Sequence, residues 1–423
     1  MNNQHRDILI IGAGPAGLAA AATAAQSGQR VTVVDDNPAR GGQIWRGDER
    51  RPPTPEAAAW FSKVEAAKVN FISGARVFAH PAPGRLLAET VAGACELRYD
   101  KLILATGARE RFLPFPGWTL PGVTGAGGLQ ALVKSGLPIT GRRVVVAGSG
   151  PLLMAVAAYL KKQGAEIVLI AEQAPLHRLL RFSFGLSGEF KKILQALDLK
   201  SELAPVPLLT GCWPVVAHGS DKLTSVTLRR GRRAWNVACD YLACGFHLVP
   251  NLELAALLSC EIEDRRVRVG DDQQTSVKNI YCAGEATGIG GLELSLLEGQ
   301  IAGFAATGNL RAAEKLFAAR RKAQRFAELL NQTFALRDEL KTLPQSDTII
   351  CRCEDVTLER LQQHAEWRAA KLHTRCGMGP CQGRVCGAAV EFLLGWENES
   401  VRPPAFPVRL ASLAATTQNQ TIS

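Results

Sequence analysis

The first 36 residues carry the feature that most constrains the fold. Residues 8–11 form a short apolar run that is typical of a buried parallel strand. A helix is expected over 18–26, and a second apolar run over 30–34 ends at Asp35. Between the first strand and the helix lie three glycines with the spacing G-x-G-x-x-G: Gly12, Gly14 and Gly17. Such glycines make the tight turn, admit a pyrophosphate and let helix and strand pack closely. The segment therefore predicts a dinucleotide site; the alternative is a glycine-rich turn in another α/β unit.

Later segments indicate that the dinucleotide is FAD. Residues 102–107 end in Ala-Thr-Gly, residues 280–285 end in Gly-Glu, and residues 37–46 contain Gly-Gly-Gln. Together they resemble the FAD-binding flavoproteins with two dinucleotide domains, which have glutathione-reductase-like Rossmann domains. The resemblance implies that Glu285, where that family usually has Asp, holds the ribityl chain, and that the Gly-Gly-Gln segment lies along the flavin. The candidate FAD residues are Gly12, Gly14, Pro15, Ala16, Gly17, Asp35, Asp36, Gly42, Gln43, Thr106, Gly107, Gly284 and Glu285.

Composition limits the class of protein. A chain of 423 residues that is 47% hydrophobic can bury a large core in two or three domains. It has no apolar run of 18 residues and no signal-peptide pattern, so we expect a cytoplasmic protein without a membrane span. The net charge is +10, but the basic residues are scattered and no nucleic-acid motif accompanies them. They are expected to be solvated, or to dock an acidic partner protein.

A second strand–helix–strand pattern follows over 143–171. Its turn reads Gly148-Ser-Gly150-Pro-Leu-Leu153, so a leucine takes the place of the third glycine. That leucine is expected to push helix and strand apart or to crowd a pyrophosphate. Glu172 lies one residue beyond the position that corresponds to Asp35. Two interpretations stay open: a scaffold with a vestigial or altered nucleotide site, and a working NAD(P)H site.

The motifs predict a discontinuous domain order in an α/β chain. The expected parts are an FAD-binding domain at 1–115 and 250–310, a second nucleotide-binding-like domain at 116–249, a connecting helix and linker at 311–345, and a C-terminal cysteine-rich domain and tail at 346–423. A helix over 292–305 is expected to direct its N-terminus at the flavin, where its dipole would stabilise the reduced, anionic ring.

Five of the eleven cysteines lie between residues 351 and 386. The pattern is Cys351-x-Cys353, then Cys376, Cys381 and Cys386 on glycine-rich turns. Thiolates on short, flexible backbone are what a tetrahedral sulfur site for Fe–S or zinc needs. Structural zinc and unrelated buried thiols remain alternatives. The residues alone also allow Cys376 to pair with Cys381, which would leave Cys386 spare.

This segment is similar to the small helical [2Fe-2S] domains at the end of bacterial flavoprotein subunits. The whole chain resembles the FAD-containing α subunits of the heteromeric opine oxidase, D-hydroxyproline dehydrogenase and hydrogen cyanide synthase family. The resemblance rests on the two glycine motifs, on residues 41–45 and 117–123, and on the cysteine segment. It implies that the cluster ligands are Cys351, Cys353, Cys381 and Cys386, with Cys376 as the alternate.

In that family a flavoprotein β subunit oxidises the amine substrate, and the α subunit carries electrons through FAD and the cluster. The resemblance therefore implies a hetero-oligomeric amino-acid, imino-acid or opine dehydrogenase, with a β partner and a small ferredoxin-like chain as a further partner. No residue of this sequence marks itself as a substrate base, so the catalytic residues are unknown. The alternatives are a self-contained NAD(P)H-dependent reductase, a hydrogen cyanide synthase subunit, and a non-enzymatic redox or zinc module.

Overall fold

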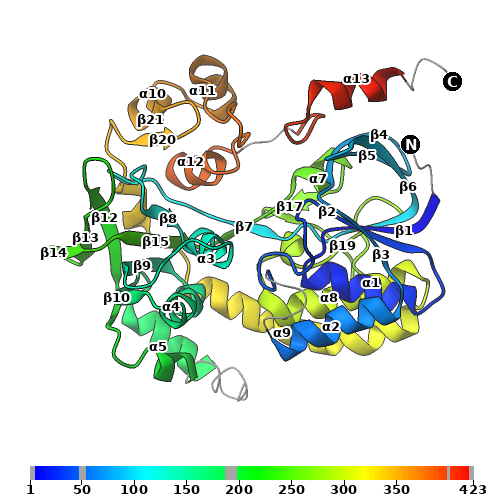
Figure 1. Cartoon of the computed structure of the whole chain (residues 1–423), viewed down its shortest axis with the longest axis horizontal. Coiled ribbons are helices and arrows are strands. Elements are labelled where there is room, and N and C mark those ends of the chain that lie inside the picture. Colours follow the sequence, from blue (N-terminus) through cyan, green and yellow to red (C-terminus); the bar gives the residue numbers. More distant parts are fainter. Residues whose placement is uncertain (1–4, 47–53, 186–197, 398–400, 419–423) are drawn as a thin grey trace. The chain divides into compact units, whose positions relative to one another are not determined.

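The computed structural model describes residues 5–46, 54–185, 198–397 and 401–418. The chain forms two compact units, each built from separate stretches (Figure 1). Unit 1 comprises Met1–Arg109, Pro250–Glu328 and Ser400–Ser423, and unit 2 comprises Glu110–Val249 and Leu329–Glu399. The chain thus passes from one unit to the other four times.

Unit 1 is built on a seven-stranded sheet with the order β3-β2-β1-β6-β5-β4, and β19 also pairs with β6. The strands are β1 (His5–Ile11), β2 (Val31–Asp35), β3 (Asn70–Ser73), β4 (Arg76–Ala82), β5 (Arg85–Thr90), β6 (Gly93–Leu104) and β19 (Ile280–Cys282). β1 runs parallel to β2 and β6, and the apolar residues 8–11 are buried. Gly74, with a φ of 65°, lies in the turn between β3 and β4.

Helices flank this sheet. They are α1 (Pro15–Ala25), α2 (Pro55–Ala66), α7 (Glu253–Leu257), α8 (Gly291–Ala306), α9 (Leu310–Thr333) and α13 (Leu410–Gln418), with a 3₁₀ turn, η1 (Glu285–Thr287), and a small hairpin, β17 (Ile262–Glu263) with β18 (Arg266–Val267). α1 and α8 pack very closely: a Cβ added at Gly299 would lie 2.2 Å from the carbonyl oxygen of Ala16. The helix of the first glycine motif is therefore fixed against the helix that follows Glu285.

The main sheet of unit 2 has the order β11-β10-β9-β15-β8, with all strands parallel. Its strands are β8 (Val123–Gly125), β9 (Arg143–Ser149), β10 (Glu166–Glu172), β11 (Leu208–Thr210) and β15 (Tyr241–Phe246); the helices are α3 (Ala126–Lys134), α4 (Leu152–Lys162) and α5 (Leu176–Gly185). An antiparallel sheet packs on one face: β12 (Cys212–His218), β13 (Ser225–Arg230) and β14 (Arg233–Ala238). β7 (Ala108–Glu110) and β16 (Leu248–Pro250) pair as a separate two-stranded sheet.

Unit 2 also holds the cysteine domain (residues 346–397). Its elements are β20 (Ile349–Cys351), β21 (Val356–Thr357), α10 (Leu358–Gln362), α11 (Trp367–Thr374) and α12 (Cys386–Leu394). The helix expected over the linker ends at Thr333, and a 3₁₀ turn follows, η2 (Asp338–Thr342). Leu340 and Leu343 of this segment join the core between the two sheets, and Trp118 Nε1 donates to the carbonyl oxygen of Ile349 at 2.6 Å. These contacts anchor the cysteine domain within unit 2.

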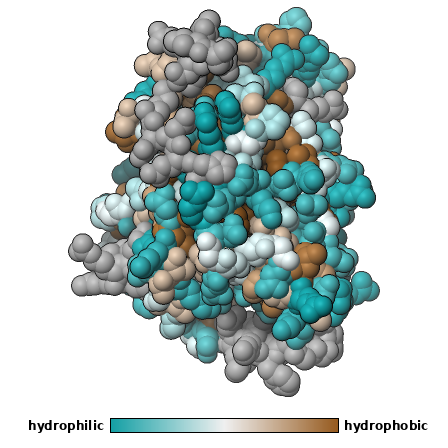
Figure 2. Space-filling model, turned by 90° about the vertical axis from the view of Figure 1, so that its right-hand side faces the viewer, coloured by the Kyte–Doolittle hydropathy of each residue, from teal (hydrophilic) through white to brown (hydrophobic). Residues whose placement is uncertain are grey.

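Among the described helices, none combines the length and the apolar character that a membrane span requires. On the face drawn in Figure 2, hydrophobic side chains lie in small groups separated by hydrophilic ones.

Candidate functional site

The first glycine loop lies between β1 and α1. A Cβ on Gly12 would lie 2.2 Å from the carbonyl oxygen of Ala105, and one on Gly17 would lie 1.8 Å from that of Gly12. Both positions therefore require glycine. Gly14 caps α1 in an extended conformation and no side chain caps the helix, which leaves its N-terminus to an anion. Gly42 closes over this loop, since a Cβ there would lie 2.9 Å from the Cα of Gly14.

The two candidate acids after β2 have different surroundings. Asp35 is buried; its Oδ2 accepts from Ala13 N at 2.5 Å and its Oδ1 accepts from Asn37 N at 2.7 Å. Asp36 is exposed and pairs with Arg76 at 3.3 Å. Asp35 is thus the acid tied to the glycine loop, while Asp36 lies at the surface.

Glu285 supplies a test of whether the residues fit a flavin. Its Oε1 accepts from Gly291 N, at the start of α8, at 2.8 Å, whereas its Oε2 is buried without a hydrogen-bond partner. Burial raises the pKa of this carboxyl, and the backbone N–H groups of Gly291 and Gly290 oppose that shift. A buried acceptor without a donor is costly. A ribityl hydroxyl would satisfy Oε2, so the residues fit FAD.

The Ala-Thr-Gly strand end is held by a residue that sequence reasoning missed. Asn251 Nδ2 donates to the carbonyl oxygen of Thr106 at 2.9 Å, and Thr106 Oγ1 donates to that of Asn251 at 2.8 Å. Asn251 N also donates to the carbonyl oxygen of Gly107 at 3.0 Å. A single asparagine in a loop gives no sequence signal, because its partners are 145 residues away.

The second glycine loop is built differently. Leu153 is fully buried in the core of unit 2, in the place of the third glycine. α4 is capped by Pro151 and begins at Leu152, one residue later than α1 does relative to its own first glycine. Glu172 Oε2 accepts from Gly150 N and its Oε1 from Ala174 N, both at 2.7 Å. Burial raises the pKa of Glu172 to about 7.

Polar groups beside this loop bind the protein's own chain. Ser149 Oγ donates to the carbonyl oxygen of Phe334 at 2.7 Å, and Gln173 Nε2 donates to Ser149 Oγ at 2.8 Å. Arg178 Nη1 donates to the carbonyl oxygen of Ala335 at 3.1 Å. The segment that follows α9 is therefore fixed at this edge of the sheet.

The five C-terminal cysteines converge in the cysteine domain. The sulfurs of three buried thiols lie within 4.8 Å of one another: Cys351, Cys376 and Cys386. Cys381 is half-buried and Cys353 is exposed, and these two thiols interact with each other. Of the predicted ligands and the alternate, the structure thus packs the alternate, Cys376, most closely with two of the others.

Hydrogen bonds lower the pKa of some of these thiols and raise that of others. Bonds from Cys376 and Cys386 lower the pKa of Cys351 to about 2, and a bond from Cys386 lowers that of Cys381 to about 5. The bond to Cys351 raises the pKa of Cys376 to about 12. Thiolates are the form that binds metal, so the arrangement suits a cation or a cluster.

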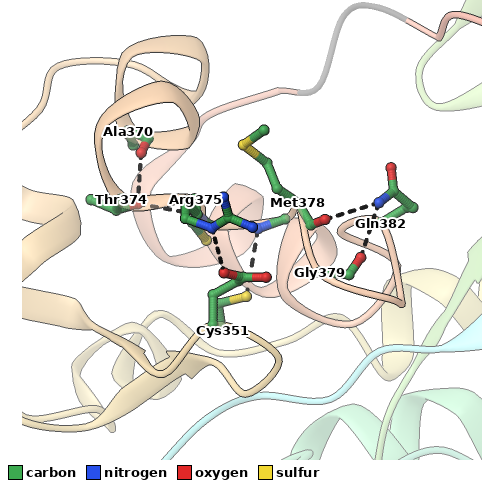
Figure 3. Close-up of polar contacts among 10 residues, drawn as sticks. Cys351, Ala370, Thr374, Arg375, Met378, Gly379 and Gln382 are labelled. Atoms are coloured by element: carbon green, nitrogen blue, oxygen red, sulfur yellow. Dashed lines mark hydrogen bonds and ion pairs between the residues drawn. The ribbon is translucent and has the colours of Figure 1, made fainter.

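Glycine turns shape this site (Figure 3). A Cβ on Gly379 would lie 2.3 Å from the Cβ of Cys353, and Gln382 Nε2 donates to the carbonyl oxygens of Met378 and Gly379, both at 3.0 Å. Arg375 pairs with Glu354 at 2.8 Å on the exposed side. The turn that carries Cys381 is therefore tightly folded next to Cys353.

Comparison with known proteins defines the class. Residues 6–305 match the sequence profile of the family described as "Pyridine nucleotide-disulphide oxidoreductase". The fold resembles that of L-proline dehydrogenase from P. horikoshii with a TM-score of 0.68 at 19% identity, covering 97% of this chain and 79% of that one. The chain belongs to this family of FAD-dependent oxidoreductases, and the predicted fold class is confirmed.

Two relatives indicate a narrower group within this family. An opine oxidase subunit of Agrobacterium tumefaciens (strain Ach5) is 32% identical over 96% of this chain and 91% of its own length. The hydrogen cyanide synthase subunit HcnB of Pseudomonas aeruginosa is also 32% identical, over 89% of this chain and 90% of its own length. The resemblance predicted from the sequence motifs is thereby confirmed.

Proposed function

We propose that this chain is the FAD- and [2Fe-2S]-containing subunit of a heteromeric amino-acid or imino-acid dehydrogenase of the D-hydroxyproline or opine type. It relays electrons from a substrate-oxidising flavoprotein β subunit. The substrate class is that of CH–NH or CH–NH₂ donors. A small ferredoxin-like chain would be a further partner, and the assembly would work in the cytoplasm.

One observation carries the proposal: a chain with an FAD motif also brings five thiols together in one small domain. A flavin accepts two electrons at once and an iron–sulfur centre accepts one, so the pair suits a relay between a two-electron donor and a one-electron acceptor. Both relatives are named as subunits, which supports a multi-subunit enzyme.

Two groups of residues form the proposed relay. The first glycine loop, Asp35 and Glu285 hold FAD, within residues 1–115 and 250–310. Four of the five thiols bind the cluster. The set Cys351, Cys353, Cys381 and Cys386 comes from the family resemblance, and the packing of Cys376 against Cys351 supports testing Cys376 equally.

The test is an anaerobic visible spectrum of the purified chain, together with iron, sulfide and zinc analysis, before and after NADH is added. We expect flavin bands with broad iron–sulfur absorption, iron and sulfide in equal amounts, and no bleaching by NADH. Zinc without iron would replace the relay by a structural zinc module. A purified single chain that oxidised proline-type substrates unaided would overturn the proposal.

A self-contained NAD(P)H-dependent reductase is the second candidate. It is favoured by the bond between Glu172 and Gly150 N, which parallels that between Asp35 and Ala13 N. It is disfavoured by Leu153 and by the chain segment bound at Ser149. Prompt bleaching of the flavin by NADH would put this candidate first.

A further inference from the structure

A buried carboxylate lies directly behind the turn that carries Glu285. Glu298, on α8, is only 2% exposed. Its Oε2 accepts from Gly284 N at 2.9 Å and from Thr287 Oγ1 at 2.7 Å. Gly284 precedes η1 and Thr287 ends it, so a single oxygen atom fixes both ends of the turn.

The turn has little freedom to lie elsewhere. Gly284 has a φ of 81°, and a Cβ there would lie 2.8 Å from the Cβ of Ala16 on α1. Gly299, next to Glu298, is pressed against the same residue. The carboxylate, the turn and the first glycine loop are therefore one packed assembly.

Few charges face Glu298. Those that act on it are Arg320 of α9, which favours its ionised form, and Glu285, which opposes it; the thiol of Cys282 on β19 lies within its field. Arg320 pairs with Asp271 at 2.7 Å, and no ion pair joins it to Glu298 among the described residues. Burial raises the pKa of Glu298 to about 7, so its charge changes within the physiological range.

We propose that Glu298 is the positioning residue of the flavin site and a group whose ionisation adds to the pH dependence of the flavin's reduction potential. It holds the Gly284–Thr287 turn and thereby orients the unpartnered oxygen of Glu285. When Glu298 is ionised, its negative charge disfavours the addition of electrons to the flavin. When it is protonated, that penalty disappears while the turn keeps an acceptor oxygen.

The inference rests on FAD binding and not on the relay role. Its test uses a chemical reductant and needs neither the cluster nor a partner, so the two proposals fail separately. The reduction potential of the bound flavin is measured spectroscopically between pH 5.5 and 9 in the full chain. Glu298→Gln is the main variant, because one amide oxygen can take both hydrogen bonds that now reach Oε2.

We expect Glu298→Gln to retain FAD, to match the natural protein at pH 5.5, and to have a more positive flavin potential at pH 9. Glu298→Ala loses both bonds and should bind FAD at least tenfold more weakly. Glu314→Gln, an exposed acid on α9, is the matched control and should change neither quantity. The proposal would be refuted if the natural protein and Glu298→Gln had the same flavin potential at every pH. It would also be refuted if their potentials differed by the same amount at every pH.

A second variant covers the case in which Glu298→Gln fails to fold. Thr287→Val removes one donor to the carboxylate and leaves the charge in place. Since that donor stabilises the ionised form, the break in the curve of potential against pH should move to higher pH. A break that stays in place would refute the role of Glu298 as well.

Discussion

Buried acids near the two glycine loops meet converging backbone N–H groups. Asp35, Glu172 and Glu298 each accept from a loop N–H at 2.5 to 2.9 Å. Burial favours the neutral acid, whereas the N–H donors favour the anion. At Glu172 and Glu298 burial dominates, and the pKa of each rises to about 7.

This balance predicts a pH-dependent stability at Glu172. Its pKa is higher in the folded protein than the ordinary 4.5, so its contribution to stability is complete below pH 4.5 and is lost as the pH rises to 7. The loss is up to about 3 kcal/mol. In Glu172→Gln, one of the two backbone N–H donors also faces the N–H group of the glutamine amide. This lowers the free energy of unfolding by about 1–3 kcal/mol at every pH.

Melting temperatures of the natural protein and Glu172→Gln between pH 5 and 8 check this prediction. The variant should have the lower melting temperature at pH 5, and the difference between the two melting temperatures should become smaller by pH 8. Glu166→Gln, at the exposed start of the same strand, should leave a constant gap. A gap at Glu172 that does not change with pH would contradict the raised pKa.

Replacing the five cysteines one at a time tests which thiols hold the proposed cluster. Each ligand changed to serine should lower the iron content well below about two atoms per chain, because the softer thiolate is lost. Replacing the fifth thiol, Cys353 or Cys376, by serine should leave the iron content near normal. Cys95→Ser, in β6 of unit 1, is the control; full iron content in all five variants would exclude a cluster at this site.

At the scale of elements, the sequence predicted the strands and helices that have a strong local pattern. The first strand–glycine–helix–strand unit formed where it was expected, because a Cβ on Gly12 or Gly17 would lie only 1.8–2.2 Å from a carbonyl oxygen. Contacts between segments that are distant in the sequence have no such local pattern. Asn251, Glu298 and the binding of residues 334–335 beside Ser149 depend on packing that no sequence spacing records.

The turn before Cys381 gives a prediction at this scale. A Cβ at Gly379 would overlap that of Cys353, whereas one at Gly387 would meet nothing within 4 Å. Gly379→Ala should therefore lower iron content at least several-fold by moving the turn. Gly387→Ala, in α12, should keep it, and equal iron content in both variants would show that the turn adapts.

The whole molecule is held together by a chain that crosses between its units four times. The last crossing leads from the cysteine domain back to unit 1. There the tail (residues 401–418) is anchored: Ala405 N donates to the carbonyl oxygen of Phe78 at 2.7 Å, and Arg409 Nε donates to Glu89 Oε1 at 2.9 Å. Ser412 Oγ donates to the same Glu89 oxygen at 2.6 Å.

Removing the tail should affect unit 1 and spare the proposed metal site. A chain that ends at residue 397 loses the contacts of Arg409 and Ser412 and the burial of Ala405. We expect a lower melting temperature and faster loss of FAD, with iron content unchanged. Glu89→Gln should reproduce part of the effect; a tailless chain with unaltered FAD retention would show that the tail is dispensable.

The four crossings also determine the order in which the parts of the two units leave the ribosome. A ribosome makes residues 329–399 after most of unit 1 and before its last segment, so the cysteine domain emerges while unit 1 still lacks residues 401–418. Domains tend to fold as they emerge, from the N-terminus onward. Unit 1 therefore cannot reach its final form until the whole cysteine domain has left the ribosome.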